Sequence, residues 1–403
     1  MKKICCVFLL VAVMGAASAE LNPPHRYFEI GTDVSAGVSN NWFAVNDFFK
    51  DVLLVDLNKM SDELKDGMNL NAAADVNVFM NLNLGKVARI GTFVAVDGDG
   101  MVNLPQTLLD FIANGNAQTP NGFSGELYIG TAVYVEAGFS IQSFVKKFGI
   151  KVTPTVFMPA LYVPDTEAAY SVSTKDDGHS SISASADISV YSAIPLDTRT
   201  LNVSEQLAGA GLDFDLEVEY PLLKNLDLGV ALRHIPAVPA SMIYKMGFTA
   251  TAEYAMEPLL NGSSSGLKYD GTYTHTDPVY ETLSSPYTVQ RPIIFGVQAA
   301  YRPFGDWFVV KGNADCVFKN PVYLNAGVEA GIYFLPMSKM GGHLLAAAFS
   351  MNYEDSVWIQ RVTIGLNLRV LELTAHVSSQ SSDFIKSFTG TGLGAGLGVR
   401  IGF

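Results

Sequence analysis

The sequence predicts an all-β fold, an antiparallel transmembrane β-barrel of about 16 strands (14 to 18) with short helices in its loops. Three observations predict it: an alternating C-terminal strand, an export-type N-terminus and two-residue alternation in between. From Gly392 to Phe403, apolar residues alternate with glycines and one arginine. Successive side chains of a strand point to opposite faces, so one face is apolar and the other nearly bare. In a transmembrane barrel the first face meets lipid and the second meets the lumen.

The C-terminal strand resembles the recognition strand that ends bacterial outer-membrane β-barrels. Its alternating apolar residues close on an aromatic carboxy-terminus. The resemblance implies that the barrel assembly machinery binds this strand. The alternative is the terminal strand of a soluble sandwich, which would be weak at this glycine content. The residues expected to face lipid and to carry this role are Leu397, Val399, Ile401 and Phe403.

The N-terminus has the pattern of an export signal. Lys2 and Lys3 precede an unbroken apolar run over 4–13, and small residues at 17–19 fit a cleavage site. The run is too short to span a bilayer. We therefore expect residues 1–19 to be a removed signal peptide and residues 20–403 to form one barrel domain in the bacterial outer membrane. Cys316 would then be the single remaining cysteine, which leaves no internal disulfide.

Composition supports a membrane barrel over other classes. No later segment holds 18 uninterrupted apolar residues, which argues against helical membrane spans. Hydropathy is nevertheless positive and charged residues make up 16% of the chain. The formal net charge of −13 argues against nucleic acid as a partner, because phosphates would be repelled.

Alternation also marks the interior of the chain. Apolar residues recur at every second position in the segments 212–220, 226–232, 293–301, 322–334 and 362–368. Weaker alternation covers 28–38, 70–84, 87–97, 125–140, 150–163 and 181–193. Long polar connections are expected at 164–180 and 257–290 and tight turns at 303–306 and 319–321, all consistent with a barrel.

Two segments have helical rather than strand periodicity. Residues 46–65 predict an amphipathic helix, and residues 105–113 predict a second short one; each is followed by a glycine. We expect both to lie in loops. The alternative is that one enters the lumen as a plug.

Charged residues on the inward faces suggest how the lumen treats solutes. Four acids at alternate positions on one strand cannot face hydrocarbon, so they line water. Basic inward residues fall on strands about half a ring away, which predicts a transverse field across the lumen. The alternative is that the charges pair locally in a filled barrel. The predicted acidic residues are Asp213, Asp215, Glu217, Glu219, Asp227 and Glu253, and the basic ones are Arg361, Arg369 and Arg400.

No enzyme, metal or cofactor site is expected. The six histidines are scattered without metal-ligand spacing, and no phosphate loop or nucleophile motif occurs. The sequence Asp97-Gly98-Asp99-Gly100 is expected to be a turn at a strand end rather than a calcium loop.

The chain as a whole resembles bacterial outer-membrane β-barrels in its signal segment and its final strand, 399–403. More narrowly, an early strand-helix-strand unit (28–84), a helix ending at Gly115-Asn116 and the strand with Tyr134 and Glu136 resemble uncharacterised barrel families of spirochaetes and Bacteroidetes. Transporters of the FadL type share the length and ending, but they carry an N-terminal plug. Here strand pattern follows Asn22-Pro23-Pro24 almost at once.

Three functions remain open. The first is a pore for small hydrophilic solutes, with a preference for cations, favoured by the acidic lumen and the inward glycines. The second is a FadL-like transporter of hydrophobic compounds, for which inward Phe79, Tyr128, Tyr134, Tyr323 and Tyr333 give partial support. The third is a non-conducting surface or adhesive barrel that binds through loop 257–290. The expected partners are outer-membrane lipid, the assembly machinery and small solutes.

Overall fold

The computed structural model describes residues 26–44, 56–65, 67–85, 87–114, 123–174, 180–195, 209–256, 269–337 and 342–403. Eighteen strands join into one antiparallel sheet. The predicted signal peptide at 1–19 lies outside the described residues. The strands are β1 (Phe28–Asn40), β2 (Met68–Asn83), β3 (Ala88–Leu104), β4 (Phe123–Val145), β5 (Phe148–Thr174), β6 (Ser180–Ser192), β7 (Gly211–Leu223), β8 (Leu226–Val238), β9 (Ala240–Met256), β10 (Tyr269–His275), β11 (Val279–Val289), β12 (Ile293–Tyr301), β13 (Phe308–Phe318), β14 (Tyr323–Pro336), β15 (His343–Glu354), β16 (Val357–Asn367), β17 (Leu371–Ser381) and β18 (Leu393–Gly402).

The sheet closes on itself because β18 pairs with β1 over ten residue pairs, from Glu29 opposite Gly402 to Val38 opposite Leu393. Among the described residues, the path of pairings that returns to its start passes through fourteen strands: β1 to β5, then β7, β8 and β12 to β18. We call this ring the closed circuit. The prediction of an antiparallel transmembrane β-barrel is confirmed, with a ring inside the range of about 14 to 18 strands.

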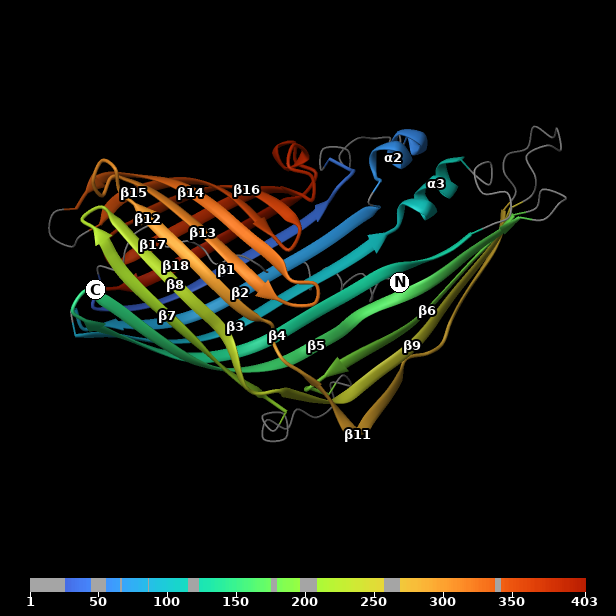
Figure 1. Cartoon of the computed structure of the whole chain (residues 1–403), viewed down its shortest axis with the longest axis horizontal. Coiled ribbons are helices and arrows are strands. Elements are labelled where there is room, and N and C mark those ends of the chain that lie inside the picture. Colours follow the sequence, from blue (N-terminus) through green and yellow to red (C-terminus); the bar gives the residue numbers. More distant parts are fainter. Residues whose placement is uncertain are drawn as a thin grey trace.

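The other four strands lengthen one side of the barrel. The N-terminal part of β5 pairs with β7, and its C-terminal part pairs with β6. β6 also pairs with β9, and β9 pairs with β10 and β11. We call β6, β9, β10, β11 and the adjoining ends of β4 and β5 the distal extension (Figure 1). β5 has 27 residues, whereas a membrane-crossing strand needs about 9 to 11, so this side projects well beyond a bilayer.

The distal extension corrects two loop predictions. Residues 164–174 belong to β5, and residues 269–289 form β10 and β11. Both stretches read as loops because they are rich in Ser, Thr and Gly. They form strands because each has a pairing neighbour, and exposed hydroxyls of Ser171 and Ser183 bond across the sheet at 2.8 Å. Residues 97–100 also lie inside β3 rather than in a turn.

Outward faces of the closed circuit are apolar, as a lipid-facing wall requires. On β1, Ile30, Val34 and Val38 are exposed. On β18, Leu397 is 66% exposed and Ile401 is also exposed, while Gly398 and Arg400 between them face the lumen. Of the four residues predicted for assembly, Val399 is half-buried, and the exposed Phe403 ring lies 5.7 Å from that of Phe28.

Two short helices pack on the end of the barrel opposite the C-terminus (Figure 1). α3 (Gln106–Asn114) matches the predicted helix at 105–113. α2 (Leu57–Glu63) lies within the predicted helix at 46–65, of which residues 46–55 are outside the described part. The buried side chains Met60 of α2 and Leu109 of α3, with Leu64 directly after α2, pack with Met68 and Leu104 of the strands.

The two helices are therefore loop elements on the outward side. Met68 and Leu104 are an even number of residues from the exposed Val78 and Val94, so they share the outward face of β2 and β3. None of the described helices is long and apolar enough to cross a membrane.

Candidate functional site

The inward wall of the closed circuit is built from pairs of one large residue and one glycine. Phe79 lies directly opposite Gly31, and a Cβ on that glycine would fall 2.5 Å from the ring. Phe93 and Gly138 repeat the arrangement, with 2.1 Å to the ring. The large side chain thus lies along the wall over its glycine instead of pointing across the lumen. The same pairing is made by Phe157 with Gly211, Gln298 with Gly229, Asp315 with Gly296, Asn352 with Gly327 and His376 with Gly396.

Asp213, the first predicted acid, is neutralised by Arg291. Its side chain is only 2% exposed and accepts two hydrogen bonds of 2.8 Å from the Arg291 guanidinium. The same guanidinium pairs with Glu136 of β4 and lies 4.7 Å from the centre of the Phe157 ring. Arg291 sits in the segment between β11 and β12, where the distal extension meets the closed circuit. Sequence reasoning missed it because the segment read as the end of a loop.

The other three acids of β7 also have partners, on β4, β5 and β8. Lys151 lies directly opposite Glu217, with 3.1 Å between Nζ and Oε1. Gln142 donates a hydrogen bond of 3.0 Å to Glu219. Asp215 accepts one of 2.9 Å from the backbone of His234. The structure therefore places these acids on the inward wall in local pairs.

The last two predicted acids lie away from the middle of the lumen. Asp227 is at the end of the barrel that holds the C-terminus and pairs with Arg302 at 2.6 Å. Glu253 lies on β9, in the distal extension, and is exposed. It shares the polar face of Ser183 and Thr272, which continues the inward face of the closed circuit.

Two of the three predicted basic residues are on the inward wall. Arg361 of β16 lies between Ser350 and Ser378, and Arg400 of β18 reaches Asp33 at 3.6 Å. Along the closed circuit, β16 and β18 are six and eight strands from β7, so they lie on the opposite side of the ring.

The prediction that Arg369 lines the lumen is wrong. Arg369 falls in the turn between β16 and β17, with φ of +73°, and is not a strand residue. Its amide donates to the Asn367 side chain at 2.9 Å, which stabilises the turn. Its carbonyl accepts a bond from Arg26 at 3.1 Å.

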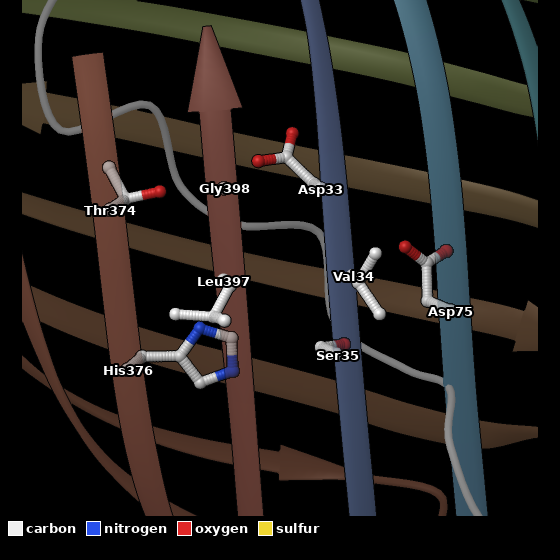
Figure 2. Close-up of a pocket in the computed structure, with 8 residues that line it drawn as sticks. All are labelled: Asp33, Val34, Ser35, Asp75, Thr374, His376, Leu397 and Gly398. Carbon is white, nitrogen blue, oxygen red and sulfur yellow. The ribbon is translucent and has the colours of Figure 1, made fainter.

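The wall of β1 to β3 holds acids that the sequence reading did not select. Asp75 lies directly opposite Asp97, an arrangement of like charges that destabilises a sheet. Asp33 and Ser35 on β1 line a small pocket with Asp75 (Figure 2). Across β18, Thr374 and His376 of β17 complete the pocket. The alternation on β2 and β3 is broken by small residues, which hid these inward acids.

Inward polar side chains remain accessible to solvent on two sides of the ring. Asp97 and Asp99 of β3 are exposed, as are Gln298 of β12 and Asn313 of β13. Their strands are five and six steps apart around the fourteen-strand closed circuit, so they belong to facing walls. Space for water therefore remains between these walls.

Several solved structures resemble this one at low identity. A deltaS2S3 mutant of the monoaromatic hydrocarbon channel TodX shares 10% identity, with a TM-score of 0.46, over 98% of this chain and 96% of that chain. The toluene transporter TbuX of Ralstonia pickettii shares 10% identity, TM-score 0.46, over 97% of each chain. The translocator domain of the autotransporter NalP from Neisseria meningitidis shares 8%, TM-score 0.33, over 100% of this chain and 96% of that chain.

We also compared the sequence with curated proteins and with family profiles. No curated protein matches the chain. One family profile does, over residues 24–403, which is nearly the whole sequence. The chain therefore belongs to DUF5723, a family of unknown function.

Proposed function

We propose that this protein is a water-filled outer-membrane channel for small hydrophilic solutes and that it favours cations. The observation that carries the proposal is the set of solvent-accessible polar side chains on facing walls: Asp97 and Asp99 on one side, Gln298 and Asn313 on the other. A filled barrel would bury these positions. Transport of hydrophobic compounds would be better served by an apolar wall.

The large inward residues do not supply that apolar wall. Phe79 lies over Gly31 beneath the Arg400 guanidinium, 5.5 Å from it. Tyr333 is buried against Val309 and Ala348 and lies over Gly331. These rings are used in packing along the wall, which supports the hydrophilic channel over the hydrophobic alternative.

The preference for cations rests on the acids that no described cation neutralises within ion-pair distance. Among the described residues, Asp75 and Asp97 have no salt bridge, whereas Asp213 and Glu217 do. Carboxylates on the wall of a narrow lumen raise the local concentration of cations. Asp75 and Asp97 should therefore control ion selectivity more than the acids of β7.

Planar bilayers test the proposal. Refolded protein should give stable conductance steps in KCl, and a KCl gradient should give a reversal potential of the cation-selective sign. The double variant Asp75→Asn/Asp97→Asn should move that potential toward zero. Glu253→Gln is the matched control, since this acid lies in the distal extension, and it should leave the potential unchanged. A folded barrel without conductance would refute the channel, and an unmoved potential would refute the role of the two acids.

A further inference from the structure

Three tyrosines stack where the distal extension meets the closed circuit. They are Tyr162 of β5, Tyr191 of β6 and Tyr287 of β11, and we call them the tyrosine cluster. The rings of Tyr191 and Tyr287 are 4.2 Å apart and nearly parallel, at 22°. Those of Tyr162 and Tyr287 are 6.0 Å apart. All three are half-buried, so part of each ring remains accessible.

Tyr162 and Tyr191 lie on the inward face, and Tyr287 stacks on them. Tyr162 is directly opposite Ala132, and Ala132 is directly opposite the inward Asp99. Tyr191 is opposite Tyr162 in turn. Tyr134, two residues from Ala132 on β4, continues this face toward the closed circuit, with its ring 6.1 Å from that of Phe157. The aromatic surface therefore runs along the wall that leads into the lumen.

Hydrogen-bonding groups of both kinds border the aromatic surface. Asp97 is directly opposite Tyr134. Asp99 is opposite Ala132, which is opposite Tyr162 on its other side, so carboxylate acceptors lie on one side of the aromatic surface. Lys245 is directly opposite Tyr191 and lies 3.9 Å from Glu281, which adds a donor on the other side. The face that leads to the cluster from outside carries serine and threonine hydroxyls, including Ser183 and Thr251.

This combination selects a class of ligand. Tyrosine rings bind flat apolar faces, and the neighbouring groups both donate and accept hydrogen bonds. A purely apolar solute would displace water from Asp99 and from the Lys245–Glu281 pair without offering any hydrogen bond in return, which is costly. A hydroxylated sugar ring offers a C–H face to the tyrosines and hydroxyls to the charged groups. Hydroxyls can both donate and accept, so such a ring suits the mixed border.

We propose that the tyrosine cluster is a binding site for neutral saccharides at the entrance of the lumen. The inference rests on the proposed channel function and specifies a solute class for it. Because the site lies at the junction of the two regions, a bound sugar would stand in the path of ions.

The experiment measures KCl current through single channels while maltotriose is added. Native protein should show transient, concentration-dependent interruptions. Tyr191→Ala and Tyr287→Ala should weaken the apparent affinity about two- to tenfold, the range expected for loss of one aromatic contact. Tyr280→Ala is the matched control, because this exposed tyrosine is also on β11 but lies opposite Met246, away from the ring contacts that Tyr287 makes with Tyr162 and Tyr191. It should leave the interruptions unchanged.

Calorimetric titration of maltotriose into detergent-solubilised, heat-modifiable barrel separates the two proposals. Binding without KCl conductance would refute the channel and retain the site. Conductance without interruptions or binding heat would refute the saccharide site and retain the channel. Equal binding by native protein and both tyrosine variants would place the sugar elsewhere and overturn the site. Interruption by tetraethylammonium but not by maltotriose would replace saccharides with organic cations.

Discussion

The closed circuit and the distal extension are parts of one sheet, yet their inward faces are built differently. In the closed circuit, large residues lie over glycines and charges are paired, as with Phe93 over Gly138 and Arg291 with Asp213. In the distal extension, small hydroxyl residues bond across strands, as with Ser171 and Ser183. Curvature brings inward side chains of the ring together, so they need complementary shapes and charges. The extension has water in front of it and needs neither.

The largest expected effect is at the junction of the two regions. Arg291→Ala would leave Asp213 buried without its cation, which costs about 3–5 kcal/mol of the free energy of unfolding. Urea unfolding in lipid, followed by heat-modifiable mobility, should show the loss. Arg302→Ala is the control: its pair with Asp227 is partly exposed and should cost at most about 1 kcal/mol. Equal losses would show that burial of the ion pair does not matter.

A glycine substitution compares the two inward faces directly. Gly138→Val places side-chain carbon against the Phe93 ring and should cost about 1–3 kcal/mol through overpacking. Gly247→Val lies on the distal extension, where the nearest atom to a new Cβ is Lys245 Cε at 3.9 Å. It should be within about 0.5 kcal/mol of native in the same unfolding assay. If both variants unfold at the same urea concentration, glycine on the ring is not a packing requirement.

Shortening the distal extension tests whether the closed circuit folds without it. Ala169 and Ser185 face each other across β5 and β6, so residues 170–184 can be replaced by an Asn-Gly turn. The shortened protein should keep heat-modifiable mobility, and its KCl conductance should stay within about twofold of native, because the closed circuit still determines the lumen. Loss of the folded form would show that the extension is required for closure.

The smallest effect is expected from the hydroxyl pairs. Ser183→Ala removes one exposed hydrogen bond of 2.8 Å and should change stability by less than about 0.5 kcal/mol. The buried Ser378→Ala on the ring is the comparison variant and should cost more, since its hydroxyl accepts a bond from Gln380. A larger loss at Ser183 would reverse the proposed difference between the regions.

The fold was predictable because lipid and lumen impose alternation on every strand of the ring. The C-terminal strand and β7 with its run of acids were found this way, whereas the helix at 105–113 was found from its helical periodicity. Within the distal extension, β6 was found at 181–193, but the end of β5 and both β10 and β11 were read as loops at 164–180 and 257–290, because their short polar side chains hide the alternation. Alternation of apolar and polar residues therefore identifies strands that face lipid better than it identifies strands in general.

The lumen was predictable only in part. A run such as Asp213 to Glu219 identifies inward acids, but their cations come from distant segments, and sequence spacing does not show that Arg291 reaches Asp213. Asp75 was missed because it is a lone acid on its strand face, and Asp97 was missed because residues 97–100 were read as a turn at a strand end. Their meeting depends on the register between β2 and β3, which only the structure supplies.

The glycine pairs of the ring imply how relatives of this protein can diverge. If Gly138 acquires a side chain, Phe93 opposite it must become smaller in the same lineage, because a Cβ there would fall 2.1 Å from the ring. The two positions of such a pair should therefore covary, because a single substitution at the glycine would overpack the wall. Related sequences should therefore vary in lumen chemistry by exchanging bulk between partners, while the width of the passage stays nearly constant.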